Sequence, residues 1–249
     1  MITDKNLFLR PMTECYLHIN PELEVVFVKD GSVSVNVGSD EFTVSANEFT
    51  IIPPYRIHGF KPSENTDAIV YMFTNSMASE FYSLCKNKEA TTPVFLLDKV
   101  TINYIILATE KYLSESGLYY AKSILNTFLA EFTRDNSFVQ MSFDASNLNR
   151  IVEYIYFNVS GDITLRDIST EFNIKENQFN KLLMGYTGLG FKEFVNAIRI
   201  EKAIVLLNRI DMNITEIAFE IGYENIRTFN RAFLKMTGLS PSQYRKKLL

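Results

Sequence analysis

One pattern occurs twice in the C-terminal part of this chain, first at 165–189 and again at 214–239. Both copies have apolar residues at helical spacing, interrupted by a residue that tolerates a left-handed backbone, and both end in Thr-Gly-Leu. The front halves align at an offset of 49 residues and the back halves at 50, so the second copy has one additional residue in its turn. Two short helices joined by a tight turn form a helix-turn-helix, and the duplication therefore predicts two such motifs.

Each copy divides into two expected helices around a turn. The first helices are expected at 165–172 and 214–221, and the second helices at about 176–185 and about 227–236. Asn173 and Gly222 are expected in the turns, because Asn and Gly tolerate a left-handed backbone. A longer helical pattern at 191–207 would join the two motifs and fix their separation.

The second helix of each copy has polar side chains between the apolar positions that would be buried. These outward-facing candidates for DNA contact are Asn177, Asn180, Lys181, Arg227, Thr228, Asn230, Arg231 and Lys235. Asn can bond adenine and Arg can bond guanine through two hydrogen bonds in the major groove, while Lys and Thr contact bases or phosphates. Two such helices about 34 Å apart could enter successive major grooves.

A plain helical bundle is the alternative interpretation of these hairpins. The duplication, with polar outward faces on both second helices, favours the DNA-binding interpretation. The second copy is expected to be the stronger reader, because Gly185 weakens the second helix of the first copy.

About 100 residues of the C-terminal part, most strongly the segment 214–245, also resemble the DNA-binding domain of AraC/XylS-type transcription regulators. The residues at that family's signature positions are Arg199, Ile217, Ala218, Gly222, Phe229, Arg231, Phe233, Gly238, Pro241, Tyr244 and Arg245. The sequence departs from the family pattern at Lys175 and Arg227, where Ser is common, and at Asn173, where Gly is usual. The resemblance implies binding to double-stranded promoter DNA, and it favours activation through contact with RNA polymerase.

Charge is distributed unevenly along the 249 residues, whose net charge is −4. Residues 1–143 carry 17 acidic and 11 basic side chains, whereas residues 144–249 carry 12 acidic and 14 basic ones. The C-terminal part is thus slightly basic, as a DNA-binding domain allows. Two cysteines without a CxxC pair, no membrane-spanning run and no secretory pattern at the N-terminus predict a cytoplasmic protein with no membrane partner.

The N-terminal part has the pattern of short strands, and the expected fold is therefore α+β with two domains. Runs rich in β-branched and aromatic residues alternate with turns and predict a cupin-like barrel over 1–99. Two helical patterns within 100–135 predict an αα-hairpin that forms a homodimer. A polar linker at 136–146 and a helical DNA-binding domain at 147–249 complete the expected organisation.

The spacing of several polar residues resembles the two motifs of a cupin barrel. His18, Asn20, Glu24 and Gly31 follow the first motif, and Asn47, Pro53 and His58 follow the second. In metal-binding cupins the first motif supplies two histidines and a carboxylate, and the second motif supplies another histidine. Asn20 replaces a histidine here, so no metal and no cofactor is assigned, although His18, Glu24 and His58 could still form a set of three ligands.

The polar residues near these motifs are instead candidates for a small-molecule effector site. They are His18, Asn20, Glu24, Arg56 and His58. A sugar or another metabolite is the expected effector, and satisfied polar groups at a barrel mouth are the alternative.

The function expected from the sequence is transcription regulation, not enzymatic catalysis. Effector binding would change how the two DNA-binding domains of a dimer are presented. A metal-dependent cupin enzyme with a helical appendage and a regulator controlled by a protein partner remain as alternatives. Neither a Walker-type phosphate loop nor a further acid–base constellation supports the enzyme.

Overall fold

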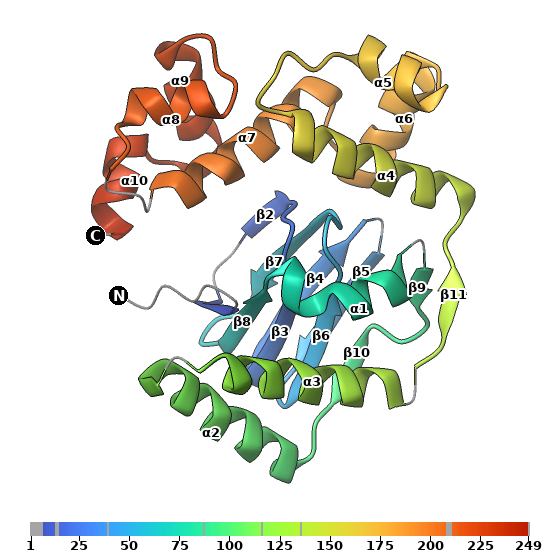
Figure 1. The fold of residues 1–249 in the computed structure, drawn as a ribbon, viewed down its shortest axis with the longest axis vertical. Coiled ribbons are helices and arrows are strands. Elements are labelled where there is room, and N and C mark those ends of the chain that lie inside the picture. Colours follow the sequence, from blue (N-terminus) through green and yellow to red (C-terminus); the bar gives the residue numbers. More distant parts are fainter. Residues whose placement is uncertain are drawn as a thin grey trace. The chain divides into compact units, whose positions relative to one another are not determined.

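The computed structural model divides into two compact units, Met1–Ser146 and Asn147–Leu249. The residues that the structure describes are 7–12, 15–38, 40–86, 88–115, 117–134, 136–207 and 211–248. The first unit is rich in strands and the second is helical (Figure 1). The predicted two-domain α+β fold is confirmed.

Two antiparallel sheets form the framework of the first unit. One has the strand order β1 (Leu7–Pro11), β8 (Asp67–Phe73), β3 (Leu23–Asp30), β6 (Glu48–Ile52) and β10 (Val94–Leu96). The other has the order β2 (Cys15–His18), β7 (His58–Pro62), β4 (Ser32–Val37) and β5 (Asp40–Ser45). Of the strands in these two sheets, β1, β2, β7 and β10 were not predicted, because they are too short or too polar to show a clear alternation.

The space between the sheets is filled by side chains that alternate along the strands. Val26 and Val28 of β3 pack with Val33 and Val35 of β4 and with Phe60 of β7. Because side chains on one face of a strand recur every second residue, Glu24 of β3 lies on the same face as Val26. This places an acidic side chain at the edge of an apolar layer.

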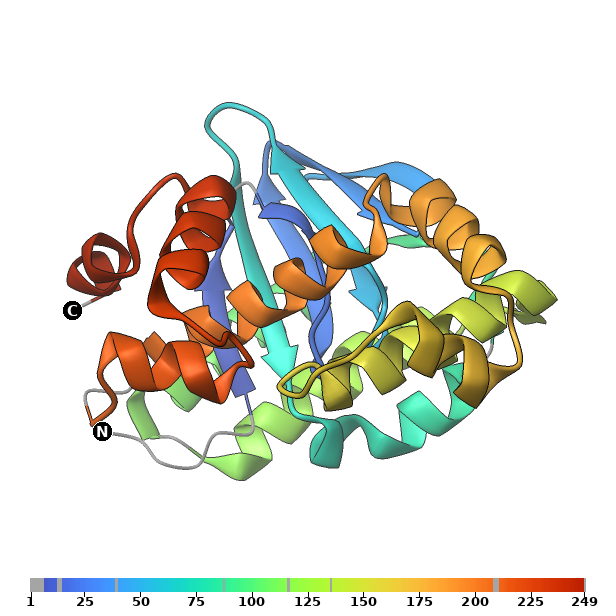
Figure 2. The same ribbon diagram turned by 90° about the horizontal axis from the view of Figure 1, so that it is seen from above.

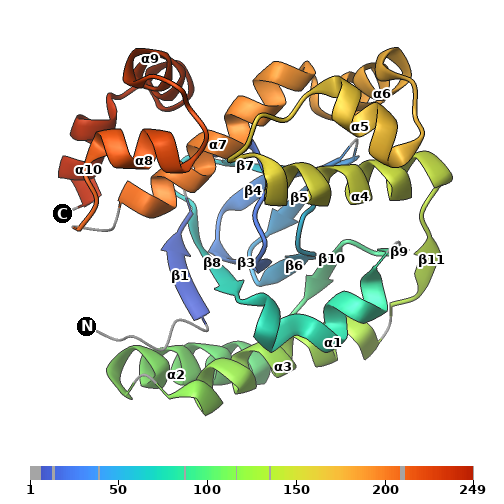
Figure 3. The same cartoon turned by 45° about the horizontal axis from the view of Figure 1, so that its top comes forward.

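The opposite face of the five-stranded sheet is covered by helices. Helices α2 (Lys99–Glu115) and α3 (Leu118–Arg134) form the predicted αα-hairpin and pack side by side (Figure 3). Phe128 of α3 contacts the rings of Phe27, Phe49 and Tyr71 on the sheet. An additional helix, α1 (Asn75–Cys85), buries Ala78, Phe81 and Cys85, and the sequence analysis did not predict it.

The segment predicted as an irregular linker, 136–146, is partly ordered as regular structure. Strand β11 (Phe138–Gln140) pairs antiparallel with β9 (Lys88–Ala90), and helix α4 (Phe143–Asn158) begins before residue 147. The linker prediction is therefore wrong for these residues. Phe138 packs against the first unit's core, which is a tertiary contact that local polarity does not reveal.

The second unit consists of two helical hairpins on a long helix. The hairpins are α5 (Leu165–Phe172) with α6 (Glu176–Thr187) and α8 (Ile214–Glu220) with α9 (Ile226–Thr237). Helix α7 (Phe191–Leu207) runs between them and contacts both (Figures 1 and 2). The bounds of α5 and α7 are as predicted, and α10 (Pro241–Leu248) is an additional helix.

No helix among the described residues combines the length and the apolar character that crossing a membrane requires.

Candidate functional site

Both hairpins of the second unit begin with a capped helix. Thr164 and Asp167 form a capping box at the start of α5, and Asn213 and Glu216 form one at the start of α8. Each box satisfies backbone N–H groups that a helix start leaves without partners. The local sequence therefore fixes where the first helix of each motif begins.

The turns have the left-handed residues that the sequence predicts. Asn173 ends α5 with a φ of 49°, and Gly222 has a φ of +91°. A Cβ atom at Gly222 would lie 2.7 Å from the carbonyl oxygen of Ser160, so only glycine fits at this close approach. The turn after α8 is longer than the turn after α5, as the change of offset from 49 to 50 predicts.

Most of the predicted DNA-contacting side chains are exposed on α6 and α9. Phe179, Phe229 and Phe233 are buried on the opposite faces of these helices. The exposed candidates are Asn177, Lys181, Arg227, Thr228, Asn230, Arg231 and Lys235. Each second helix thus presents a polar surface on one side and an apolar anchor on the other, which is the arrangement that a recognition helix requires.

Asn180 differs from the other candidates in α6. Its side chain is half-buried, and its Oδ1 accepts a hydrogen bond of 3.2 Å from the backbone N–H of Phe191, at the start of α7. This bond gives Asn180 a structural role in joining the first hairpin to α7. Sequence periodicity did not reveal this role, because the partner lies in the next helix.

Gln178 is an exposed residue of α6 that the sequence analysis did not select. It stands 50 residues before Thr228, which is a selected candidate. The alignment of the two copies at an offset of 50 residues could therefore have identified Gln178. Its amide can bond adenine in the manner of Asn.

The starts of the two recognition helices differ. Asn225 caps α9, because its side chain accepts a hydrogen bond of 2.8 Å from the backbone N–H of Thr228. Lys175 precedes α6 without a side-chain cap. Arg227 lies inside α9, and Asn225 is the residue that caps the helix. The replacement of the family's Ser by Arg227 therefore does not remove a cap.

A groove beside α9 brings several of these residues together. Its volume is about 470 Å³, and its lining includes Asn230, Arg231 and Leu234 of α9. Ser240 and Ser242, at the start of α10, line the same groove. Arg231 therefore lies beside hydroxyl groups that can contact a phosphate backbone.

Arg199 has a structural role in the second unit. Its guanidinium donates hydrogen bonds of 2.9 Å to the carbonyl oxygens of Val159 and Gly161 and stacks over the ring of Tyr223. Burial raises the pKa of Tyr223 to about 12, although the charge of Arg199 opposes the shift. Arg199 thus joins α7 to the ends of α4 and α8, which explains a signature residue away from the recognition helices.

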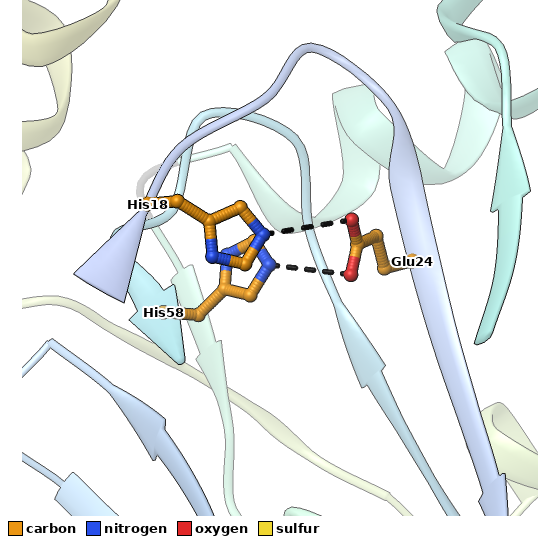
Figure 4. Close-up of side chains that lie close together, drawn as sticks. All are labelled: His18, Glu24 and His58. Atoms are coloured by element: carbon orange, nitrogen blue, oxygen red, sulfur yellow. Dashed lines mark hydrogen bonds and ion pairs between the residues drawn. The ribbon is translucent and has the colours of Figure 1, made fainter. Parts of the chain in front are cut away.

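Three of the predicted effector residues form a buried cluster in the first unit. His18 is 4% exposed, Glu24 is 0% exposed and His58 is 1% exposed. Their side chains converge from β2, β3 and β7 (Figure 4). His58 Nε2 lies 3.2 Å from Glu24 Oε2, and His18 Nε2 lies 4.0 Å from Glu24 Oε1.

The environment of Glu24 keeps its carboxyl group ionised. Burial alone would raise the pKa of Glu24, but the charge and hydrogen bond of His58 and the charges of His18 and Arg10 together lower it to about 2. The side-chain amide of Asn20 donates a hydrogen bond to Glu24 Oε1. Asn20 therefore belongs to this cluster, as predicted from the spacing.

Arg56 points to a different part of the first unit. Its guanidinium donates a hydrogen bond of 2.9 Å to the carbonyl oxygen of Lys88 and another, of 2.8 Å, to the sulfur of Met141. Only its backbone carbonyl reaches the cluster, where it lies 2.8 Å from His58 Nδ1. The five predicted effector residues thus separate into a cluster of four and a single arginine.

Comparisons with known proteins identify relatives of this chain. A family profile described as a helix-turn-helix domain matches residues 168–247. An uncharacterized HTH-type transcriptional regulator of Staphylococcus aureus is 33% identical over 98 residues, which are 39% of this chain and 13% of that protein. The HTH-type regulator YfiF of Bacillus subtilis is 30% identical over 123 residues, which are 49% of this chain and 39% of that protein. The chain thus spans less than half the length of these relatives.

Solved structures resemble the whole chain in fold. The structure of an apo form of a ToxT variant from Vibrio cholerae aligns with this chain with a TM-score of 0.67 and 14% identity. The alignment covers 100% of this chain and 100% of the ToxT chain. The structure of ToxT with a bound unsaturated fatty acid aligns with a TM-score of 0.61 and 16% identity, and the alignment covers 96% of this chain and 93% of the ToxT chain. At this identity the similarity shows a shared fold.

The second unit is therefore a helix-turn-helix domain with two motifs. The resemblance of this part of the chain to the AraC/XylS-type DNA-binding domain, predicted from its motifs, is confirmed.

Proposed function

We propose that this chain is a sequence-specific transcription regulator of the cytoplasm, with DNA as its target and a small molecule as its signal. The observation that carries the proposal is the duplicated hairpin on α7, with exposed Arg231 on α9 and exposed Lys181 on α6. Two recognition helices on one supporting helix suit successive major grooves of promoter DNA. The similarity of residues 168–247 to helix-turn-helix domains supports the same function.

The test is a binding titration on operator DNA selected from a random library. We expect Arg231→Ala to weaken binding by about 10- to 100-fold and to relax sequence preference, because Arg can bond one guanine through two hydrogen bonds. Lys181→Ala should weaken binding less. Arg134→Ala is the matched control, because it removes one exposed positive charge from α3 in the first unit. Failure to select any sequence, or equal losses in Arg231→Ala and Arg134→Ala, would contradict the proposal.

The proposed effector is an amphipathic carboxylic acid that binds the first unit. Structures of ToxT, whose fold this chain shares, contain an unsaturated fatty acid and a naphthalenyl-butenoic acid. A sugar is the second candidate, because the polar groups of the first unit also suit hydroxyls. Thermal shifts with a monounsaturated fatty acid and with a monosaccharide distinguish the two classes.

We further propose that the regulator is a homodimer that contacts RNA polymerase. Helix α2 supports the dimer, because Val100, Tyr104 and Leu107 form an exposed apolar row. The family resemblance of the second unit favours activation through polymerase contact. In this proposal the chain is not an enzyme, and no protein partner replaces the effector.

A further inference from the structure

We infer that His18, Glu24 and His58 form a binding site for one divalent transition-metal ion in the first unit. The three side chains each offer one ligand atom, and these atoms all lie within 4.8 Å of one another. This inference concerns the first unit alone, and it does not depend on the proposed DNA binding.

The distances in the cluster suit a shared ion. Ligand atoms bound to one ion at about 2.0–2.2 Å lie roughly 3 to 4 Å apart. His58 Nε2 lies 3.2 Å from Glu24 Oε2 and His18 Nε2 lies 4.0 Å from Glu24 Oε1, so each imidazole is within this range of a different carboxylate oxygen. One ligand atom from each of the three residues can be chosen so that all lie within 4.8 Å of one another. Small movements of the side chains would bring both imidazoles and one carboxylate oxygen onto one ion (Figure 4).

The hydrogen bonding of His58 provides a second argument. Its Nδ1 lies 2.8 Å from the carbonyl oxygen of Arg56, and a carbonyl only accepts, so Nδ1 carries the hydrogen. In a neutral imidazole, Nε2 then has a lone pair, and this lone pair faces Glu24 Oε2 at 3.2 Å. Two acceptors at this distance require a proton or a cation between them. A metal ion can occupy this place as the cation.

The residues around the cluster have the roles of outer partners in a metal site. A ligating histidine usually donates its other N–H to a carbonyl or carboxylate, as His58 does to Arg56. Ligating carboxylates are in turn hydrogen-bonded, as Glu24 is by the amide of Asn20. Asn20 therefore orients a ligand instead of serving as one.

The backbone fixes the geometry of the three ligands. His18 and His58 stand directly opposite each other in the register of β2 and β7, and their ring centroids are 4.1 Å apart. Glu24 comes from the other sheet, on the face that carries Val26. The site thus spans the two sheets, and an ion would join them.

The ligand set indicates which ions fit. Two imidazoles and one carboxylate suit Zn²⁺, Fe²⁺, Mn²⁺, Co²⁺ and Ni²⁺, and they disfavour Mg²⁺ and Ca²⁺, which prefer oxygen ligands. Three protein ligands leave further coordination positions open for water or an oxygen of a bound molecule.

The test uses the full chain after treatment with a chelator. Zn²⁺ is added to the folded protein in one arm and during refolding in another, because the ligands are buried and exchange could be slow. We expect binding of one Zn²⁺ per chain and a rise in melting temperature. X-ray absorption of the zinc complex should show two imidazole ligands, and His18 and His58 are the only histidines of the chain.

Variants separate this site from surface binding. Glu24→Gln and His58→Gln should each weaken Zn²⁺ binding by at least tenfold, while Glu110→Gln, on the exposed side of α2, should not. Circular dichroism checks that each variant folds. Absence of saturable binding in both arms, unchanged binding in the folded site variants, or a zinc shell without two imidazoles would overturn the inference. If a site variant fails to fold, X-ray absorption of the unaltered chain still tests the inference, because it shows whether two imidazoles bind the zinc.

Discussion

At Gly222 the chain approaches the carbonyl oxygen of Ser160 so closely that a Cβ atom would lie 2.7 Å from it. The same residue has a φ of +91°, in the left-handed region that other residues rarely adopt. Gly238 also has a positive φ, +71°, but nothing lies within 4 Å of its hypothetical Cβ. A comparison of substitutions at the two glycines therefore distinguishes the effect of backbone strain from that of a steric clash.

We expect Gly222→Ala to lower the free energy of unfolding by about 3 kcal/mol, because strain and clash add. Gly238→Ala serves as the control and should lower it by only about 1 kcal/mol, because it adds strain alone. Urea denaturation followed by circular dichroism measures both. Equal losses in the two variants would show that the contact with Ser160 relaxes freely.

The residues of the candidate sites could be predicted where local spacing determines them. The spacing of the cupin-like motifs selects His18, Glu24 and His58, and the structure brings their side chains together from β2, β3 and β7. Arg56 lies two residues before His58 in the sequence, but its guanidinium donates a hydrogen bond to the carbonyl oxygen of Lys88, so its side chain lies outside the cluster. The hydrogen bond that Asn180 accepts from Phe191 could not be predicted either, since its partner is eleven residues away and in the next helix.

Helix α2 shows an exposed apolar row at the scale of a single element. Val100 is 79% exposed, Tyr104 is 45% exposed and Leu107 is 56% exposed. Their spacing of four and then three residues places them on one face of the helix. A second copy of this face is the proposed partner.

We expect the double variant Tyr104→Asp, Leu107→Asp to weaken dimerisation by at least tenfold, because it introduces charge into an apolar contact. Size-exclusion chromatography with light scattering measures the mass over a range of concentrations. Leu113→Asp is the control, because Leu113 is 58% exposed but does not continue the row. A monomeric unaltered chain, or equal effects of the control, would contradict the proposed interface.

Elements with a strong period could be predicted from the sequence, and short or polar ones could not. Helix α7 was predicted with its observed bounds, because apolar residues recur through all 17 of its positions. Strand β11 has three residues, and its pairing partner β9 lies far away in the sequence. No local sequence pattern therefore predicts β11. Helix α10 has a strongly polar sequence, and its place depends on the contact of Tyr244 with Phe233.

The whole chain is acidic, with a net charge of −4, although its proposed target is a polyanion. Attraction to DNA must therefore come from a local surface. Lys181, Arg227, Arg231 and Lys235 are exposed on the two recognition helices. Lys235 lies 3.5 Å from Glu193, which reduces its availability.

We expect the logarithm of the affinity for operator DNA to fall with the logarithm of the salt concentration, with a slope of about −3 to −4. This slope corresponds to about four neutralised phosphates. Arg231→Ala should reduce the magnitude of the slope by about 1 if its guanidinium also contacts a phosphate, and Arg134→Ala should leave it unchanged. Filter binding at several salt concentrations measures the slope. A slope near zero would show that these cations do not contact the backbone.

The two-unit organisation was predictable from the sequence because the period of apolar residues changes along the chain. Strand-like alternation dominates before residue 75, and helical spacing dominates after residue 99. The pairing order of the strands could not be predicted, because β3 pairs with β6 and β8, which are far from it in the sequence.

The confinement of both histidines to one buried cluster has a practical consequence for spectroscopy. Selective ¹⁵N labelling of histidine would give nuclear magnetic resonance signals from two rings only, and both rings lie between the same two sheets. The ring nitrogen shifts would then report which nitrogen holds a proton, without assignment of any other resonance. The two histidine rings thus serve as a spectroscopic reporter of changes at the cluster of His18, Glu24 and His58.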